Sequence, residues 1–225
     1  QIKLDICCQD LPVIIIGVGP GLGYGPDGPT HHAVEDLTLM SILPNMAIYN
    51  PCDPVNTAHA VQLAVARRRP AYIRLDRAAV TPLYAPDDDV SQGMKTQHDG
   101  SDVVIFSSGT LTYQALDAAK HLEASGVSTK IVDVFQVKPL NEEALLEAVD
   151  GIGTIVSVEE HNATLGFGSL IATTLLKNGV SKNIHIHGLP DEFLFGSASR
   201  DWAYDKFGLN GQGICDFTKN ALDRK

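Results

Sequence analysis

The chain has 225 residues, with 44% hydrophobic and 20% charged side chains, which is long enough and ordinary enough for one large folded domain or two smaller ones. Its formal net charge of −10 argues against nucleic acid or an anionic membrane as the main partner. The four cysteines form no C-x-x-C pair and no apolar run reaches the length of a membrane span, so we expect no metal-binding residues and a reduced, cytoplasmic protein.

The first third of the chain alternates between strand and helix patterns. Residues 12–19, PVIIIGVG, form a continuous β-branched run that predicts a strand buried on both faces of a parallel sheet. Thr30 is the expected N-cap of a helix that follows the next loop. The pattern then predicts a strand at 46–51, a helix at 53–69 capped by Asp53, and a strand at 71–77. Strands alternating with helices are typical of βαβ units.

A second alternating series follows a change in composition. Residues 81–101 are rich in proline, aspartate and glycine and predict a linker or an exposed hairpin. Beyond them, strands are expected at 102–109, 128–135, 153–160 and 183–189, and helices at 111–126, 141–151 and 166–179. The predicted fold class is therefore α/β, with two doubly wound βαβ modules at 1–80 and 102–225 joined by the linker.

The loop after the first strand, GVGPGLGYGPDGPTHHAVEDL at 17–37, carries the strongest functional signal. A dinucleotide fingerprint is not supported, because the position that needs its third glycine holds Leu22 or Tyr24, and Pro20 lacks a phosphate-binding N–H. Ligands bind at the carboxyl ends of parallel strands, so the loop could instead present Asp27 and His31 at the start of a helix. There a histidine would stay neutral and exchange protons near pH 7. The alternative is structural, with Asp27 capping the turn and His31 bonding backbone.

Two other groups of polar residues keep alternative interpretations. Glu159, Glu160 and His161 end a predicted strand, where they could line a dimer interface, border the active site or simply face solvent. His185 and His187 alternate along the last strand and would point to one face, but the sequence supplies no supporting carboxylate for a metal site.

The stretch GYGPDGPTHHAVEDLTLMSILPNMAIYNPCDPVNTAHAV resembles the pyrimidine-binding domain of transketolases, whose pattern runs G-x-D-G-x-T-H-Q, a helix, P-N and P-A-D. YIRLDR is similar to the strand that follows in that family, and TIVSVEEHNATLGFGS and GLPDEFLFGSA are similar to its C-terminal domain. The resemblance covers nearly the whole chain and is closest to the split type, in which the C-terminal half is a separate polypeptide. It implies a partial pyrimidine-binding domain followed by a transketolase C-terminal domain.

The resemblance assigns roles to three residues. Asp27 matches an aspartate that contacts a hydroxyl of the donor sugar, and His31 matches a histidine that contacts the sugar near the reacting carbons, which makes His31 the expected catalytic residue. Arg77 matches the arginine that grips the sugar phosphate, with Arg74 as second choice. Gly19 stands where the family's sugar-phosphate enzymes have a histidine, which weakens the expectation of their usual pentose phosphates.

The resemblance also implies thiamine diphosphate with Mg²⁺, bound mainly by a partner. The family's catalytic glutamate and the aromatic residues that stack on the pyrimidine precede the first residue here, and no G-D-G metal motif occurs, so the cofactor-binding residues of this chain are unknown. We therefore expect a chain that is inactive alone and needs both a missing N-terminal segment and the N-terminal transketolase subunit, in a homodimer or an α₂β₂ assembly.

The expected reaction moves a two-carbon ketol unit from a ketose or ketose phosphate to an aldose. The alternatives are a chain like deoxyxylulose-phosphate synthase or the β chain of 2-oxoacid dehydrogenases, or a non-catalytic assembly module of the same fold.

Overall fold

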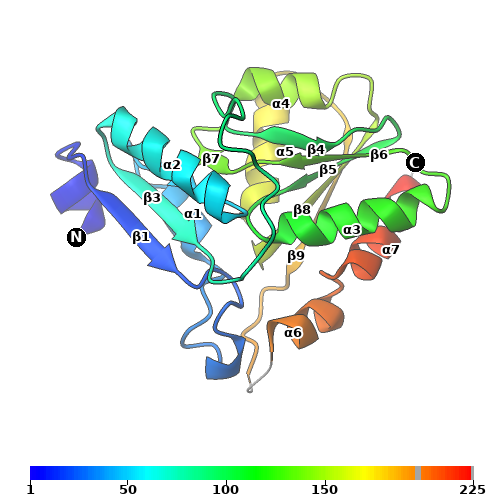
Figure 1. Ribbon diagram of the computed structural model, residues 1–225, viewed down its shortest axis with the longest axis horizontal. Helices are drawn as coiled ribbons and strands as arrows, with labels where there is room; N and C mark the ends of the chain where they lie inside the picture. Colours follow the sequence, from blue (N-terminus) through cyan, green and yellow to red (C-terminus); the bar gives the residue numbers. More distant parts are fainter. Residues whose placement is uncertain (196–198, 224–225) are drawn as a thin grey trace.

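The computed structural model describes residues 1–195 and 199–223, in which two β-sheets lie side by side with helices over them (Figure 1). Residues 196–198, the end of the GLPDEFLFGSA segment, lie outside the described residues, as do 224 and 225. Among the described helices, none has both the length and the apolar character that crossing a membrane requires. The predicted α/β class is confirmed, and the first sheet takes one strand, β7, from the second half of the chain.

The first sheet has the strand order β1-β3-β2-β7. Its first three members are parallel, and β7 is antiparallel to β2. The strands are β1 (Ile14–Val18), β2 (Ala47–Tyr49), β3 (Ala71–Leu75) and β7 (Gln136–Lys138), and the accompanying helices are α1 (Asp36–Ser41) and α2 (Pro54–Arg67), with a short π-helix at Ile2–Cys7. Asp53 caps α2 as predicted, because its carboxylate accepts the Asn56 N–H at 2.7 Å.

The second sheet has the order β4-β6-β5-β8-β9 and is parallel except for β4. Its strands are β4 (Lys95–His98), β5 (Val103–Ser107), β6 (Thr129–Asp133), β8 (Thr154–Asn162) and β9 (Asn183–Leu189). The helices of this half are α3 (Leu111–Glu123), α4 (Glu142–Ala148), α5 (Phe167–Lys177), α6 (Arg200–Phe207) and α7 (Gly211–Asp223).

Strand β5 explains why this sheet needs helices on both faces. Val103 and Ile105 pack in one cluster with α3 and α7, whereas Val104 and Phe106 pack in another with α4 and α5. All four side chains are fully buried, as the two-residue repeat of a central strand requires. The second cluster also contains Leu37, Met46 and Ile48 of the first half, so the two halves share a core.

Strand β1 departs from the prediction of burial on both faces. It pairs only with β3 and lies at the edge of its sheet, where Ile16 and Val18 remain 54% and 51% exposed. The β-branched run favours a strand but carries no information about what covers it. The helix expected after Thr30 was also placed wrongly, because α1 begins only at Asp36, with Glu35 at its N-cap.

The segment between the halves is tied down at several points. Residues 95–98 of the predicted linker form β4, which pairs with β6. Tyr84 is buried, and its backbone N–H and that of Leu83 donate to Asp53 at 3.0 and 2.7 Å. The Tyr84 hydroxyl donates to Asp133 of β6 at 2.8 Å. The division of the chain at 80 and 101 stays a prediction.

The fully buried Asp133 makes stability depend on pH. Burial raises its pKa to about 7, although bonds from Tyr84 and Thr112 oppose the rise. Because this folded-state pKa lies above the ordinary 3.8, the folded chain holds more protons than the unfolded chain between those values. The stabilisation from this group is complete below pH 3.8 and is lost as pH rises to about 7.

We predict that Asp133→Asn flattens this dependence. Urea denaturation between about pH 5 and about pH 7 should show the free energy of unfolding falling with pH less steeply than in the wild type. The exposed Asp150→Asn serves as the control and should keep the wild-type slope. An Asp133→Asn slope equal to that of the wild type would show that the carboxyl does not titrate in this range.

Candidate functional site

The candidate site lies at the carboxyl ends of parallel strands from both sheets. The glycine-rich loop follows β1, Asp76 and Arg77 follow β3, Thr110 follows β5, and Glu160 is near the end of β8. The loop hangs below the sheets in Figure 1, and its short 3₁₀ helix η2 (Gly25–Asp27) lies against α6. Ligands of open parallel sheets bind at this edge.

Backbone hydrogen bonds cross the loop and connect it to β3. Gly21 and Ala33 exchange two hydrogen bonds of 2.9 Å across the loop, and the Gly19 N–H donates to the Leu75 carbonyl of β3 at 3.0 Å. Near the tip, the Asp27 N–H donates to the Tyr24 carbonyl at 2.9 Å. The loop is therefore an ordered segment stabilised by its own backbone hydrogen bonds and by β3.

The Tyr24 ring brings two of the predicted site residues together. The guanidinium carbon of Arg77 lies 4.9 Å from its ring centroid, and the His31 ring is 6.3 Å away at a tilt of 57°. Asp27 ends the helical turn that Tyr24 begins. Asp27, His31 and Arg77 are all exposed, so their polar groups are open to a ligand.

The local setting of His31 differs from the prediction. Its Nδ1 lies 3.0 Å from the hydroxyl of Thr30, so Thr30 orients the imidazole instead of capping a helix. Because α1 starts at Asp36, His31 does not lie at the start of a helix as predicted. Among the described residues, the Asp27 carboxylate has no hydrogen-bond or ion-pair partner, which leaves it free to accept from a sugar hydroxyl.

Arg74, the second choice for a phosphate ligand, has a different role. It is 3% exposed, and its Nε donates to Asp36 at 2.9 Å. The same guanidinium donates to the Ala33 carbonyl at 2.8 Å and the Glu160 carbonyl at 3.1 Å. These bonds tie β3 to α1, the loop and β8, and leave Arg74 turned away from solvent.

A buried cluster of charges supports the loop from beneath. The Glu160 carboxylate accepts the Leu22 N–H at 2.8 Å and is paired with Arg200 through both of its oxygens. Arg200 also donates to Asp76 at 2.7 Å and to the Thr110 hydroxyl at 3.0 Å. We call Glu160, Arg200, Asp76 and Thr110 the junction cluster, because it joins the first sheet to the second.

Electrostatics within the junction cluster favour the ionised forms. Burial raises the pKa of Asp76, but bonds from Arg200 and Thr110 outweigh burial and hold that pKa below its ordinary value. Burial alone would lower the pKa of Arg200, and the neighbouring Glu160 and Asp76 carboxylates raise it instead. Gly21 must lack a side chain here, because a Cβ would lie 2.5 Å from Glu160 Cδ and the backbone has a φ of +55°.

The neighbouring residues on β8 are buried as well, so these strand-end groups do not simply face solvent. The Glu159 carboxylate accepts the Phe167 and Gly168 N–H groups at 2.6 and 3.1 Å at the start of α5, and burial raises its pKa to about 7. His161 is 1% exposed, and burial lowers its pKa.

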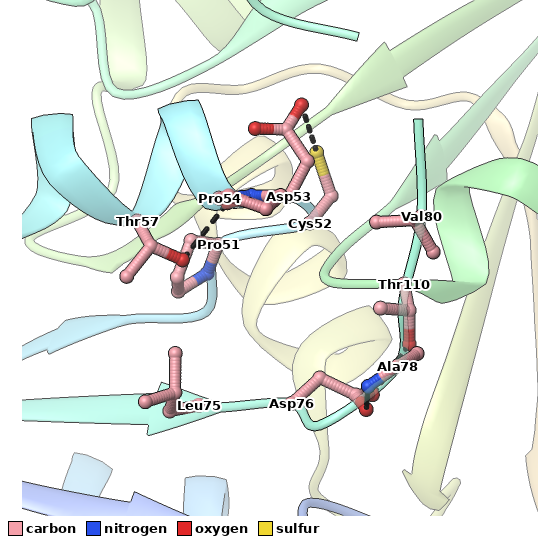
Figure 2. A pocket seen from close by; sticks show the side chains of 10 residues that line it. All are labelled: Pro51, Cys52, Asp53, Pro54, Thr57, Leu75, Asp76, Ala78, Val80 and Thr110. Carbon is pink, nitrogen blue, oxygen red and sulfur yellow. Dashed lines mark hydrogen bonds between the residues drawn. The ribbon is translucent and has the colours of Figure 1, made fainter. Parts of the chain in front are cut away.

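A cavity of about 250 Å³ lies beside the junction cluster. Figure 2 shows that it opens between the start of α2 and the segment after β3, with Asp53 and Asp76 on opposite sides. Asp53 is bonded to Asn56, Leu83 and Tyr84, and Asp76 is bonded within the junction cluster. Both carboxylates that line the cavity are therefore used in hydrogen bonds that stabilise the fold. Asp27, His31 and Arg77 do not line this cavity.

Sequence reasoning missed Tyr24 and most of the junction cluster. Tyr24 is the one aromatic residue inside the glycine-rich stretch, which is the signal that could have drawn attention to it. Arg200 and Asp76 lack any local signal, since their contact joins residues 124 positions apart.

No three His, Cys, Asp or Glu side chains in residues 1–195 and 199–223 are grouped to hold a metal ion. His187, one of the two histidines on β9, instead stacks on Phe217 at 4.3 Å and bonds the Gly208 carbonyl at 2.7 Å.

Two family descriptions match the chain. Residues 1–82 match "Transketolase, pyrimidine binding domain", and residues 93–214 match "Transketolase, C-terminal domain".

Individual relatives and a solved structure are also similar to nearly the whole chain. The chain is 35% identical to a subunit of the apulose-4-phosphate transketolase of Phocaeicola vulgatus, over 99% of this chain and 70% of that protein. It is 33% identical to a 1-deoxy-D-xylulose-5-phosphate synthase of Syntrophotalea carbinolica, over 97% of this chain but 34% of that protein. A solved split gene transketolase, described as an inactive beta4 tetramer, superposes with a TM-score of 0.89 at 34% identity, covering 99% of this chain and 71% of its own.

We predict that Arg200→Gln lowers the free energy of unfolding by about 3 kcal/mol, because it leaves Glu160 and Asp76 buried without their counter-charge. Lys120→Gln, which breaks the exposed pair with Asp117, is the control and should cost about 0.5 kcal/mol or less. Urea denaturation of both variants measures the difference. Equal costs would contradict a supporting role for the junction cluster.

Proposed function

The chain belongs to the transketolase family, of which it is the C-terminal subunit or a C-terminal section, and from that premise we propose that it positions the donor sugar phosphate in a split transketolase. The reaction moves a two-carbon ketol unit from a ketose phosphate to an aldose. The observation that carries this proposal is the exposed group of Asp27, His31 and Arg77 around the Tyr24 ring.

Each side chain of the group suits one part of such a donor. The Arg77 guanidinium offers paired N–H donors that match a phosphate. The Asp27 carboxylate accepts from a sugar hydroxyl and fixes the orientation of the chain of carbons. The His31 imidazole donates to or accepts from a hydroxyl near the reacting carbons and is the candidate general acid–base.

Family membership implies dependence on thiamine diphosphate, which supplies a carbanion for ketol transfer. The cofactor and its Mg²⁺ would be held mainly by a partner subunit carrying the diphosphate-binding half, as the similarity to a split transketolase supports. The names of the relatives as subunits support such a partner. We propose a homodimeric or α₂β₂ assembly in the cytoplasm.

The substrates named for relatives agree with an anion-binding arginine. The relative from Phocaeicola vulgatus is named for apulose 4-phosphate, and another relative for a sulfonated deoxyfructose. Both carry an anionic group on a sugar. We therefore propose that the preferred donor is a sugar with an anionic group, and that neutral sugars are poorer donors.

The test is ketol transfer by the chain assembled with its partner subunit, thiamine diphosphate and Mg²⁺. His31→Ala should lower kcat/KM about a hundredfold and Asp27→Asn about tenfold, because each removes a contact to the reacting end of the donor. His121→Ala, an exposed histidine on α3, is the control and should match the wild type.

Wild-type turnover in His31→Ala would contradict the assignment of His31 as a catalytic residue. An active assembly that takes a 2-oxoacid but no ketose phosphate would favour the alternative suggested by the similarity to deoxyxylulose-phosphate synthase. An assembly with neither activity would favour a non-catalytic module.

A further inference from the structure

We propose that Tyr24 is a positioning residue that holds the Arg77 guanidinium ready for the anionic group of the donor, an inference that rests on the proposed function. Neither the motif resemblance nor the family matches assign any role to Tyr24. Its ring is close to two of the three candidate site residues: the Arg77 guanidinium carbon is 4.9 Å from the ring centroid and the His31 ring centroid is 6.3 Å from it.

Arg77 needs such support because little else holds its side chain. It is exposed, and its backbone N–H, not its guanidinium, donates to Asp76 at 2.6 Å. A free arginine side chain samples many rotamers and loses that freedom when it binds a ligand. The aromatic face attracts the guanidinium and restricts it before the ligand arrives.

The ring attracts the Arg77 guanidinium through its π electrons and not through a conventional hydrogen bond, which leaves the N–H donors of Arg77 available. These donors lie in the plane of the guanidinium. That plane presents the paired donors that a phosphate or sulfonate accepts. The ring therefore orients the arginine without competing for its hydrogen bonds.

Gly19 and Tyr24 act as one unit. A Cβ at position 19 would lie 2.0 Å from Tyr24 Cε2 and 2.3 Å from Cδ2, so a side chain there and the ring in its present place exclude each other. Gly19 also has a φ of +83°, a conformation that residues with side chains rarely adopt. Because Gly19 has no side chain, the Tyr24 ring can occupy the space that a Cβ at position 19 would fill.

The consequence is selectivity for charge on the donor. Loss of the ring should weaken recognition of the anionic group more than recognition of the sugar hydroxyls, which Asp27 and His31 would contact. If Tyr24 only stabilised the loop, loss of its ring would weaken recognition of the anionic group and of the hydroxyls equally.

The first experiment uses the chain assembled with its partner subunit and the cofactor, with D-fructose 6-phosphate and D-fructose as paired donors. Tyr24→Leu should raise the ratio of KM for the phosphorylated donor to KM for the neutral donor about tenfold. Tyr24→Phe keeps the ring and should restore the wild-type ratio. Trp202→Leu, which removes an exposed ring 5.3 Å from the Lys206 ammonium, is the matched control and should leave the ratio as it is.

Changes at Arg77 and Gly19 test whether these residues act on the donor through the same interaction as Tyr24. Arg77→Gln should raise the same ratio, and the Tyr24→Leu/Arg77→Gln double variant should raise it no further, because both changes remove one interaction. Gly19→Ala, whose Cβ would displace the ring, should also raise the ratio. Equal changes in both KM values, or additive effects, would overturn the inference.

A second measurement separates this inference from the proposed function. Inorganic phosphate should raise the thermal midpoint of the wild-type assembly above that in chloride of equal ionic strength, and Tyr24→Leu and Arg77→Gln should need about tenfold more phosphate for the same shift. If neither sugar is a donor while this difference holds, the proposed function fails and the role of Tyr24 stands. Identical phosphate titrations of wild type and Tyr24→Leu would overturn the role of Tyr24.

Discussion

The ion pair between Glu160 and Arg200 is the contact that joins the two sheets next to the candidate site. Glu160 belongs to the second sheet yet accepts the Leu22 N–H of the loop that leaves the first, and Arg200 reaches from α6 to Asp76 after β3. The Glu160 and Asp76 side chains are only 4% and 9% exposed, so each carboxylate depends on its partner charge. The carboxyl ends of both sheets are consequently fixed relative to each other.

The candidate site forms a second layer that faces solvent next to the junction cluster. Tyr24, Asp27, His31 and Arg77 are carried by segments whose backbones are bonded to β3 and across the loop, while their side chains face outward. Binding residues commonly occupy loops that a rigid framework positions. The layer places an exposed guanidinium, carboxylate and imidazole near one another, an arrangement that suits the anionic sugar donor of the proposal.

The sequence predicted the elements well and their surroundings less well. The apolar run at 102–109 predicted the strand β5, which is buried on both faces because strands and helices flank it, whereas β1, for which burial on both faces was predicted, lies at an edge. The three-residue β7 was missed because it is too short to show a period and pairs with the other half of the chain. The loop motif singled out Asp27 and His31, but the bond between Leu22 and Glu160 spans 138 positions and leaves no local pattern.

Native-state hydrogen exchange at the Leu22 amide tests most directly whether the junction cluster holds the loop. Because this N–H donates to the buried Glu160 carboxylate, the account predicts that it exchanges only through unfolding close to global, with protection like that of the central β5 amides. Protection should fall by orders of magnitude in Arg200→Gln. Exchange of Leu22 in the wild type at the rate of an open loop would contradict the account, since the site residues would then lack the fixed platform on which the proposed function depends.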